Sequence, residues 1–201
     1  MNAHLFWSCL LGAVVGYFCG SINSAALFAR ARGVNLSSSG SGNPGATNAG
    51  RVMGRGVGIA VLIFDMLKGL IPVLVFGWWA GPTAAVVTGI AAVIGHMTSP
   101  FLHFKGGKGV ATTLGVVIGV HPIWLIPMLV CFAIVFVLTR RTGIASVAGA
   151  LGLIASAIIF HPTVPLLIFG VVIGVLIIIR HHANIAMFWR SLTNDSSSTT
   201  T

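Results

Sequence analysis

A short polar segment, residues 40–48, carries side chains well suited to bind an anion. It reads G-S-G-N-P-G-A-T-N, and two arginines follow it at positions 51 and 55. Glycines let a ligand approach the backbone N–H groups closely, and the serine, threonine and asparagine side chains add uncharged hydrogen bonds. The segment therefore predicts an oxyanion site, with phosphate as the first choice. Its candidate residues are Ser41, Gly42, Asn43, Thr47, Asn48 and Arg51.

Two further polar clusters have the same character. One is His96 followed by F-K-G-G-K-G at residues 104–109, where glycines precede a predicted helix and leave its first N–H groups free. The other is R-H-H-A-N at residues 180–184, which ends an apolar stretch. Each alone is compatible with a basic turn or an interfacial anchor, but three such clusters in one apolar chain indicate a shared anion site. They add the candidates His96, Lys105, Gly106, Gly107, Lys108, Arg180, His181 and Asn184.

The composition places these clusters in a membrane protein. Hydrophobic residues make up 56% of the 201-residue chain, charged residues make up 6%, and the acids are Asp65 and Asp195 alone. A soluble domain of this size needs far more surface charge. The net charge of +9 does not indicate nucleic acid, because the basic residues lie in short connections and form no continuous stripe.

Seven apolar stretches predict an all-α integral membrane protein with seven transmembrane segments. Most are long enough to cross a hydrocarbon core of roughly 30 Å as a helix. The fourth is short and, taken alone, is also compatible with a re-entrant helix. The stretches are residues 4–29, 57–80, 83–99, 109–120, 123–139, 143–160 and 163–180.

The positions of lysine and arginine predict the orientation. Ten of the eleven basic residues lie on alternate connections or in the C-terminal region, and positively charged connections stay on the cytoplasmic side. We therefore expect the N-terminus outside, the C-terminus in the cytoplasm, and all three polar clusters at the cytoplasmic face. Residues 1–190 are expected to form one membrane-embedded domain, and the Ser/Thr-rich residues 191–201 a disordered tail.

The eleventh basic residue, Lys68, lies within the second stretch. Asp65 precedes it by three residues, so both share one helix face. Charge inside a membrane is costly, and pairing lowers that cost. The spacing is compatible with a buried ion pair that fixes helix packing, and also with a support or relay for the anion site.

Other classes of function fit the residues less well. The histidines lack carboxylate partners for a metal, so no metal or other cofactor is expected. Ser-His-Asp catalysis is conceivable, but the available acid is beside Lys68. A transporter of organic phosphate would share the positive mouth, yet its polar residues would extend to the midplane in an internal repeat. A purely structural membrane subunit would leave the glycine-rich clusters without a role.

Taken together, the motifs resemble the PlsY family of acyl-phosphate:glycerol-3-phosphate acyltransferases of bacterial membranes. The resemblance rests on G-S-G-N-P-G-A-T-N with Arg51, the run from Phe64 to Gly69, G-H-x-x-x-P with F-K-G-G-K-G-V-A-T, and R-H-x-x-N-I. It covers nearly all of the chain in the family's order. It implies a seven-helix enzyme of the bacterial cytoplasmic (inner) membrane, with its active site facing the cytoplasm and no cofactor.

The resemblance also implies a reaction. An acyl group passes from acyl phosphate to the 1-hydroxyl of glycerol 3-phosphate, giving 1-acylglycerol 3-phosphate (lysophosphatidic acid) and phosphate, the first acylation of phospholipid synthesis. The residues of all three clusters carry over as substrate-handling residues, with Lys108, His96 and His181 as catalytic candidates. The chain departs from the family at Ala183, where an acid is usual, and in its Ser/Thr-rich tail.

These residues suggest how two phosphates are held. We expect Lys108 and the backbone of residues 41–43 to bind the acyl phosphate, and Arg51, Lys105, His181 and Asn184 to bind glycerol phosphate, although the two assignments can be exchanged. Phosphate is a good leaving group, so alignment and charge stabilisation should dominate catalysis. The proton acceptor is left open between His96, His181 and a phosphate oxygen of the substrate.

Overall fold

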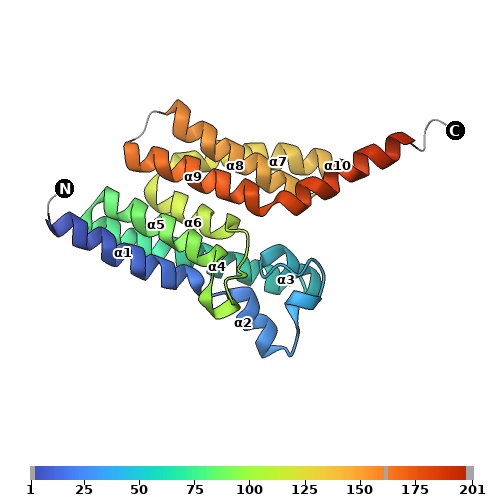
Figure 1. Ribbon diagram of the computed structural model, residues 1–201, viewed down its shortest axis with the longest axis horizontal. Helices are drawn as coiled ribbons and strands as arrows, with labels where there is room; N and C mark the ends of the chain where they lie inside the picture. Colours follow the sequence, from blue (N-terminus) through green and yellow to red (C-terminus); the bar gives the residue numbers. More distant parts are fainter. Residues whose placement is uncertain (1–2, 161–162, 198–201) are drawn as a thin grey trace.

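The structure, a computed structural model, describes residues 3–160 and 163–197, and most of these residues are helical (Figure 1). Within them the chain forms ten α-helices, three short 3₁₀ helices and no strand, which confirms the all-α prediction. The α-helices are α1 (Ala3–Ser21), α2 (Ser24–Ala31), α3 (Ala46–Met53), α4 (Arg55–Ala80), α5 (Pro82–Met97), α6 (Val110–Val120), α7 (Leu125–Thr139), α8 (Thr142–Ile159), α9 (Val164–Arg180) and α10 (His182–Ser197).

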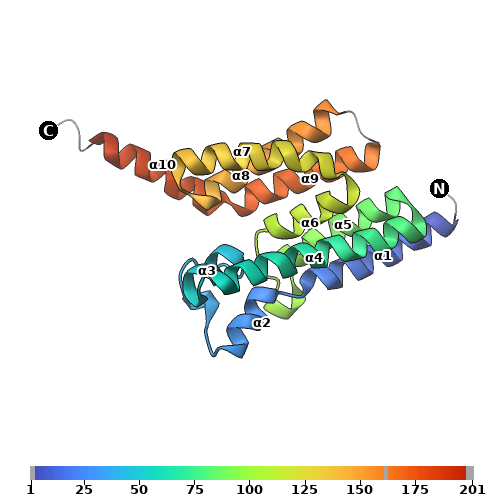
Figure 2. The same ribbon diagram turned by 180° about the vertical axis from the view of Figure 1, so that it is seen from behind.

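The helices form two layers. Helices α1, α4, α5 and α6 pack together in one, and α7, α8 and α9 form the other (Figures 1 and 2). Helices α5 and α6 contact α9 between the layers. Helices α2 and α3 lie at the end of their layer away from the N-terminus, and α10 extends outward from the corresponding end of the other layer (Figures 1 and 2).

Several helices are suited to cross a membrane. Five in the described residues are long and apolar enough, and a sixth span results if α9 and α10, bent by 55°, count as one. Each of the seven predicted stretches corresponds to at least one helix, but α6 has 11 residues, about 16 Å, and is too short to span alone. The number of seven spans and the orientation of the termini therefore stay predictions.

Two segments that the sequence assigned to loops are helical. Gly45 caps α3, so Thr47, Asn48 and Arg51 lie on a helix and only residues 40–45 form a loop. Helix α10 extends through Ser197 and so includes the first part of the Ser/Thr-rich segment; the disordered tail at residues 191–201 stays a prediction. Residues 198–201 of that tail lie outside the described residues. Neither segment contains a long apolar run, which was the signal by which the sequence identified helices.

Candidate functional site

A cavity of about 840 Å³ lies between the two helix layers and takes in most of the predicted residues. Part of its wall is apolar and comes from α4, α6, α7 and α9, including Leu62, Leu114 and Phe132. The predicted site residues on the wall are Ser41, Asn43, Thr47, Asn48, Arg51, Asp65, His96, Lys108, His181 and Asn184. The structure thus brings all three polar clusters to one cavity, as the sequence predicted.

The polar wall is strongly cationic. Arg51, Arg55, Lys108, Arg140 and Arg141 all line it. Among the side chains that the structure describes, the one carboxylate, that of Asp65, pairs with Lys68 and with none of these five. Uncompensated cations around a cavity attract anions, and guanidinium groups match phosphate geometry especially well. The arrangement is therefore suited to anionic ligands with an apolar portion.

The loop at residues 40–45 is held by asparagine side chains. The buried Asn48 accepts a hydrogen bond from the Ser41 amide (N···Oδ1 2.8 Å) and donates one to the Ser39 carbonyl (3.1 Å). Asn23 Nδ2 donates to the Pro44 carbonyl (3.0 Å). These bonds fix the loop backbone against α2 and α3. Asn48 is thus a positioning residue for the loop as well as part of the cavity wall.

The second glycine cluster packs against the end of α5. The amides of Gly106 and Gly107 donate to the carbonyls of Met97 and His96 (both 3.1 Å), and a Cβ on Gly107 would overlap the His96 ring. Gly109 has φ 84° and caps α6, whose N-terminus follows directly. This left-handed conformation favours glycine. The segment therefore lies too close to α5 for side chains at these glycines.

Arg180 joins the second and third clusters. Its Nη2 donates to the carbonyls of Gly106 (2.7 Å) and Gly107 (3.0 Å). Lys108 Nζ donates to Asn184 Oδ1, and burial, followed by the charge of Arg180, lowers the pKa of the Lys108 ammonium. The end of α9 thus positions the glycine loop, and Lys108 and Asn184 lie side by side on the wall.

His181 is held in one tautomer by the backbone. Its Nδ1 lies 2.8 Å from the Ile177 carbonyl oxygen and must donate the proton to it, because a carbonyl only accepts. The side chain is buried and lines the cavity. In the neutral ring, Nε2 then carries the lone pair, so His181 can accept a hydrogen bond from a ligand.

The Asp65–Lys68 ion pair forms as predicted, with 2.7 Å between Oδ1 and Nζ. Lys68 also donates to the Ile22 carbonyl (2.7 Å), and Ser24 Oγ donates to Asp65 Oδ1 (2.9 Å). These partners lie where α1 ends and α2 begins, and the neighbouring His96 lies at the end of α5. The pair is therefore level with the helix ends that border the cavity, not deep in the bundle as its position in the second stretch suggested.

Several predicted residues lie off the cavity wall, and several wall residues were missed. Gly42, Gly106, Gly107, Arg180 and Lys68 are behind or beside the wall, and Lys105 is exposed on the glycine loop. The sequence analysis used Arg55, Arg140 and Arg141 mainly to predict the orientation in the membrane, but all three line the cavity. They were predicted to lie on the same cytoplasmic side as the polar clusters, and this shared location could have identified them as site residues. Other wall residues that were missed include Thr142, Gly143 and Ser146.

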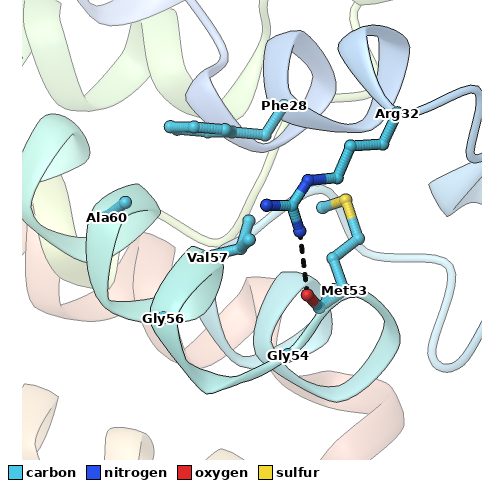
Figure 3. A pocket seen from close by; sticks show the side chains of 7 residues that line it. All are labelled: Phe28, Arg32, Met53, Gly54, Gly56, Val57 and Ala60. Carbon is cyan, nitrogen blue, oxygen red and sulfur yellow. Dashed lines mark hydrogen bonds between the residues drawn. The ribbon is translucent and has the colours of Figure 1, made fainter.

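A second, smaller cavity of about 310 Å³ lies between α2 and the start of α4 (Figure 3). Arg32 extends across it and donates from Nη1 to the Met53 carbonyl (3.0 Å), which lies at the end of α3. The rest of its wall is glycine and apolar side chains such as Phe28 and Val57. It contains none of the predicted site residues and is separate from the main cavity.

Several known proteins are similar to this chain over most of its length. Residues 10–191 match the family model described as glycerol-3-phosphate acyltransferase. A protein of that name from Geobacter sulfurreducens is 45% identical over 180 residues, covering 88% of this chain and 91% of the relative. Another from Aquifex aeolicus is 41% identical over 175 residues, covering 86% and 91%.

Two crystal structures are also similar. Both are of PlsY (YgiH), an integral membrane glycerol 3-phosphate acyltransferase, and both share 37% sequence identity over 92% of this chain and 93% of that one. The TM-score is 0.87 for the glycerol 3-phosphate form and 0.83 for the lysophosphatidic acid form.

Proposed function

Because this chain belongs to the glycerol-3-phosphate acyltransferase family, we propose that it transfers an acyl group from acyl phosphate to the 1-hydroxyl of sn-glycerol 3-phosphate. The products are 1-acylglycerol 3-phosphate (lysophosphatidic acid) and inorganic phosphate. This would be the first acylation step of phospholipid biosynthesis.

One observation carries the proposal: a single cavity joins a cationic wall to an apolar one. Donor and product each combine a phosphate with an alkyl chain, and the acceptor is a small phosphate ester. Five lining cations without a carboxylate partner among the described side chains suit the two phosphates. The side chains of α4, α6 and α7 suit the acyl chain.

The reaction depends mainly on aligning the acceptor hydroxyl with the acyl carbonyl carbon. The hydroxyl oxygen attacks the acyl carbonyl carbon, the bond from that carbon to the phosphate oxygen breaks, and phosphate leaves with the electron pair. Lys108 and the backbone of residues 41–43 would hold the acyl phosphate, and Arg51, His181 and Asn184 the glycerol phosphate. Lys108 and Asn184 are hydrogen bonded, which supports adjoining positions for the two phosphates. Fixed positive groups lower the barrier as charge develops on the leaving phosphate.

The same proposal includes a place in the cell. Seven spans, with the short α6 as the fourth, would put the N-terminus outside, the C-terminus in the cytoplasm and the cavity at the cytoplasmic face of a bacterial inner membrane. The gathering of three basic clusters at one cavity supports this orientation, because positive connections stay in the cytoplasm. Residues 1–190 would form a single domain.

The test uses purified protein in detergent with palmitoyl phosphate and glycerol 3-phosphate. We expect phosphate release that requires both substrates, with an equal yield of the acylated product. Palmitoyl-CoA in place of palmitoyl phosphate is the matched control and should give no product. Release without glycerol 3-phosphate would contradict acyl transfer, and glycerol 3-phosphate counterflow in vesicles without release would indicate a transporter.

Replacing His181 by alanine should raise the KM for glycerol 3-phosphate about tenfold, the loss expected for one hydrogen bond of about 1.4 kcal/mol. Its Nδ1–H is committed to Ile177, so Nε2 would accept from a hydroxyl of the acceptor. Initial rates over a range of glycerol 3-phosphate concentrations and pH check this. A large fall in kcat with unchanged KM, together with loss of one limb of the pH profile, would instead assign proton transfer to His181.

A further inference from the structure

The smaller cavity, between α2 and the start of α4, contains a cation that lies outside the main cavity. The Arg32 side chain extends between Phe28 and the first turn of α4 (Figure 3). Its hydrogen bond to the Met53 carbonyl uses one of the five N–H groups of the guanidinium. No carboxylate among the described side chains pairs with Arg32. The guanidinium is therefore held across the cavity with donors left for an anion.

Part of the cavity wall is bare backbone. Gly54 and Gly56 line it, and a Cβ at either position would meet nothing within 4 Å. Gly54 precedes the first residue of α4, and no side chain caps that helix. The first N–H groups of a helix have no partner within the helix and carry partial positive charge. An anion bound by Arg32 would therefore lie near these N–H groups as well.

The cavity lies where two candidate membrane spans have their ends. Residues 3–31 form one of these spans, and Arg32 follows it directly. Helix α4 is another, and it begins at Arg55. Phospholipid headgroups, with their phosphates, lie just outside the hydrocarbon core that the apolar part of a span crosses. The cavity is therefore at the depth of the headgroups.

An exposed apolar stripe leads away from the cavity along α4. Ala60 lines the cavity. The exposed residues Phe64, Leu67 and Ile71 follow it at helical spacing, which places them on one face. The rings of Phe28 and Phe64 are 6.0 Å apart, so the cavity and the stripe are continuous. A volume of about 310 Å³ is near the small end of ligand cavities, which suits a headgroup but not its acyl chains.

We propose that this cavity binds the headgroup of a membrane phospholipid, with the phosphate on Arg32 and the acyl chains along the exposed face of α4. A guanidinium matches the geometry of phosphate oxygens, and the stripe matches the apolar chains. Arg55, between the two glycines of the wall, lines the main cavity. A bound lipid should therefore stabilise the joint between α3 and α4, which carries Arg51 and Arg55. The lipid site does not depend on the proposed acyl transfer.

Thermal unfolding of the full-length protein in detergent tests the site, with dioleoyl phosphatidylglycerol as the probe. We expect a saturable rise in the unfolding midpoint of roughly 5 °C at lipid concentrations well above Kd. Dioleoylglycerol has the same chains but no phosphate, and inorganic phosphate has no chains, so each should give a much smaller rise. An equal rise with dioleoylglycerol would contradict the role of phosphate. An equal rise with inorganic phosphate would contradict a lipid occupant.

Two arginines of the α2 segment give a matched pair of variants. Arg32→Gln should weaken lipid binding, measured from the lipid dependence of the midpoint, at least about tenfold, because it removes a charge-assisted hydrogen bond. Arg30 is exposed on α2 and does not line the cavity, so Arg30→Gln should bind lipid like the wild type. A lipid held in the main cavity, or attracted by net charge alone, would stabilise both variants equally, and that result would overturn the proposal.

Ala60→Leu covers the case in which Arg32→Gln fails to fold because the Met53 carbonyl loses its donor. Leucine would fill part of the cavity and leave Arg32 unchanged, and it is well tolerated in a helix. We expect this variant to unfold near the wild-type midpoint without lipid and to lose the lipid-induced rise. A full rise in Ala60→Leu would mean that the lipid binds elsewhere, and it would overturn the proposal.

Discussion

Replacing Lys108 by alanine should lower kcat/KM by about 10³-fold, the upper range for removing one preorganised group that stabilises developing charge. Lys108 is a partly buried cation on the cavity wall, beside Asn184 and next to the N-terminus of α6. No carboxylate among the described side chains pairs with it. Its charge is therefore free to act on a phosphate, and the effect should exceed that of any exposed cation.

Lys105 is the matched control for this prediction. It is a lysine of the same glycine loop, but it is exposed and lies off the cavity wall, so Lys105→Ala should cost far less activity. Both variants should unfold at the wild-type temperature. Near-wild-type turnover in Lys108→Ala, or equal losses in the two variants, would remove Lys108 from the phosphate site.

Lys108 should also determine how the activity declines at alkaline pH. Burial lowers the pKa of Lys108, so its charge is lost at a lower pH than that of an exposed lysine. Phosphate binding should weaken as the pH rises through that lowered pKa. Lys108→Arg, whose guanidinium stays charged, should move the decline to higher pH at reduced activity.

Which residues gather at the cavity was largely predictable, because they lie in contiguous motifs. Gly109 before an apolar run indicated the start of a helix, and α6 begins at Val110. The basic residues on alternate connections indicated that three distant clusters would share one side, and the cavity contains members of all three. Asp65 and Lys68 were expected to pair from their spacing alone, and they do.

The other features of the site could not be predicted, because they depend on how far each helix extends past its neighbours. Asp65 neighbours His96, which lies near the end of α5. The end of α5 therefore lies beside a point about ten residues into α4. That offset places the ion pair at the cavity, and no local pattern encodes it. Arg140 and Arg141 likewise reach the cavity only because α7 and α8 form the facing layer. These are properties of helix register and packing, which a count of apolar residues does not contain.

Gly95→Ala is the second substitution with a large expected effect. It should destabilise the protein by about 3 kcal/mol or more and abolish activity, because the helices pack too closely there for a larger side chain. A Cβ at Gly95 would overlap the Tyr17 carbonyl oxygen, and one at Gly20 would overlap the Ala92 carbonyl. Small residues on both sides thus bring the backbones of α1 and α5 into contact, as is common between helices in membranes. Overlap with a carbonyl cannot be relieved by a side-chain rotation, so the helices must separate.

Separation of α1 from α5 should reach the site, because three hydrogen bonds near residue 95 join these helices. Tyr17 Oη donates to the Thr98 carbonyl (2.9 Å), Ser99 Oγ to the Ser21 carbonyl (2.6 Å) and Ser21 Oγ to the Gly95 carbonyl (3.3 Å). His96 lies among these anchors. Gly56→Ala is the matched control, since a Cβ there meets nothing within 4 Å and the residue is in the first turn of α4; it should be neutral or stabilising by up to about 1 kcal/mol. Thermal unfolding in detergent compares the two, and equal midpoints would mean that α1 can move away without cost and does not set the position of His96.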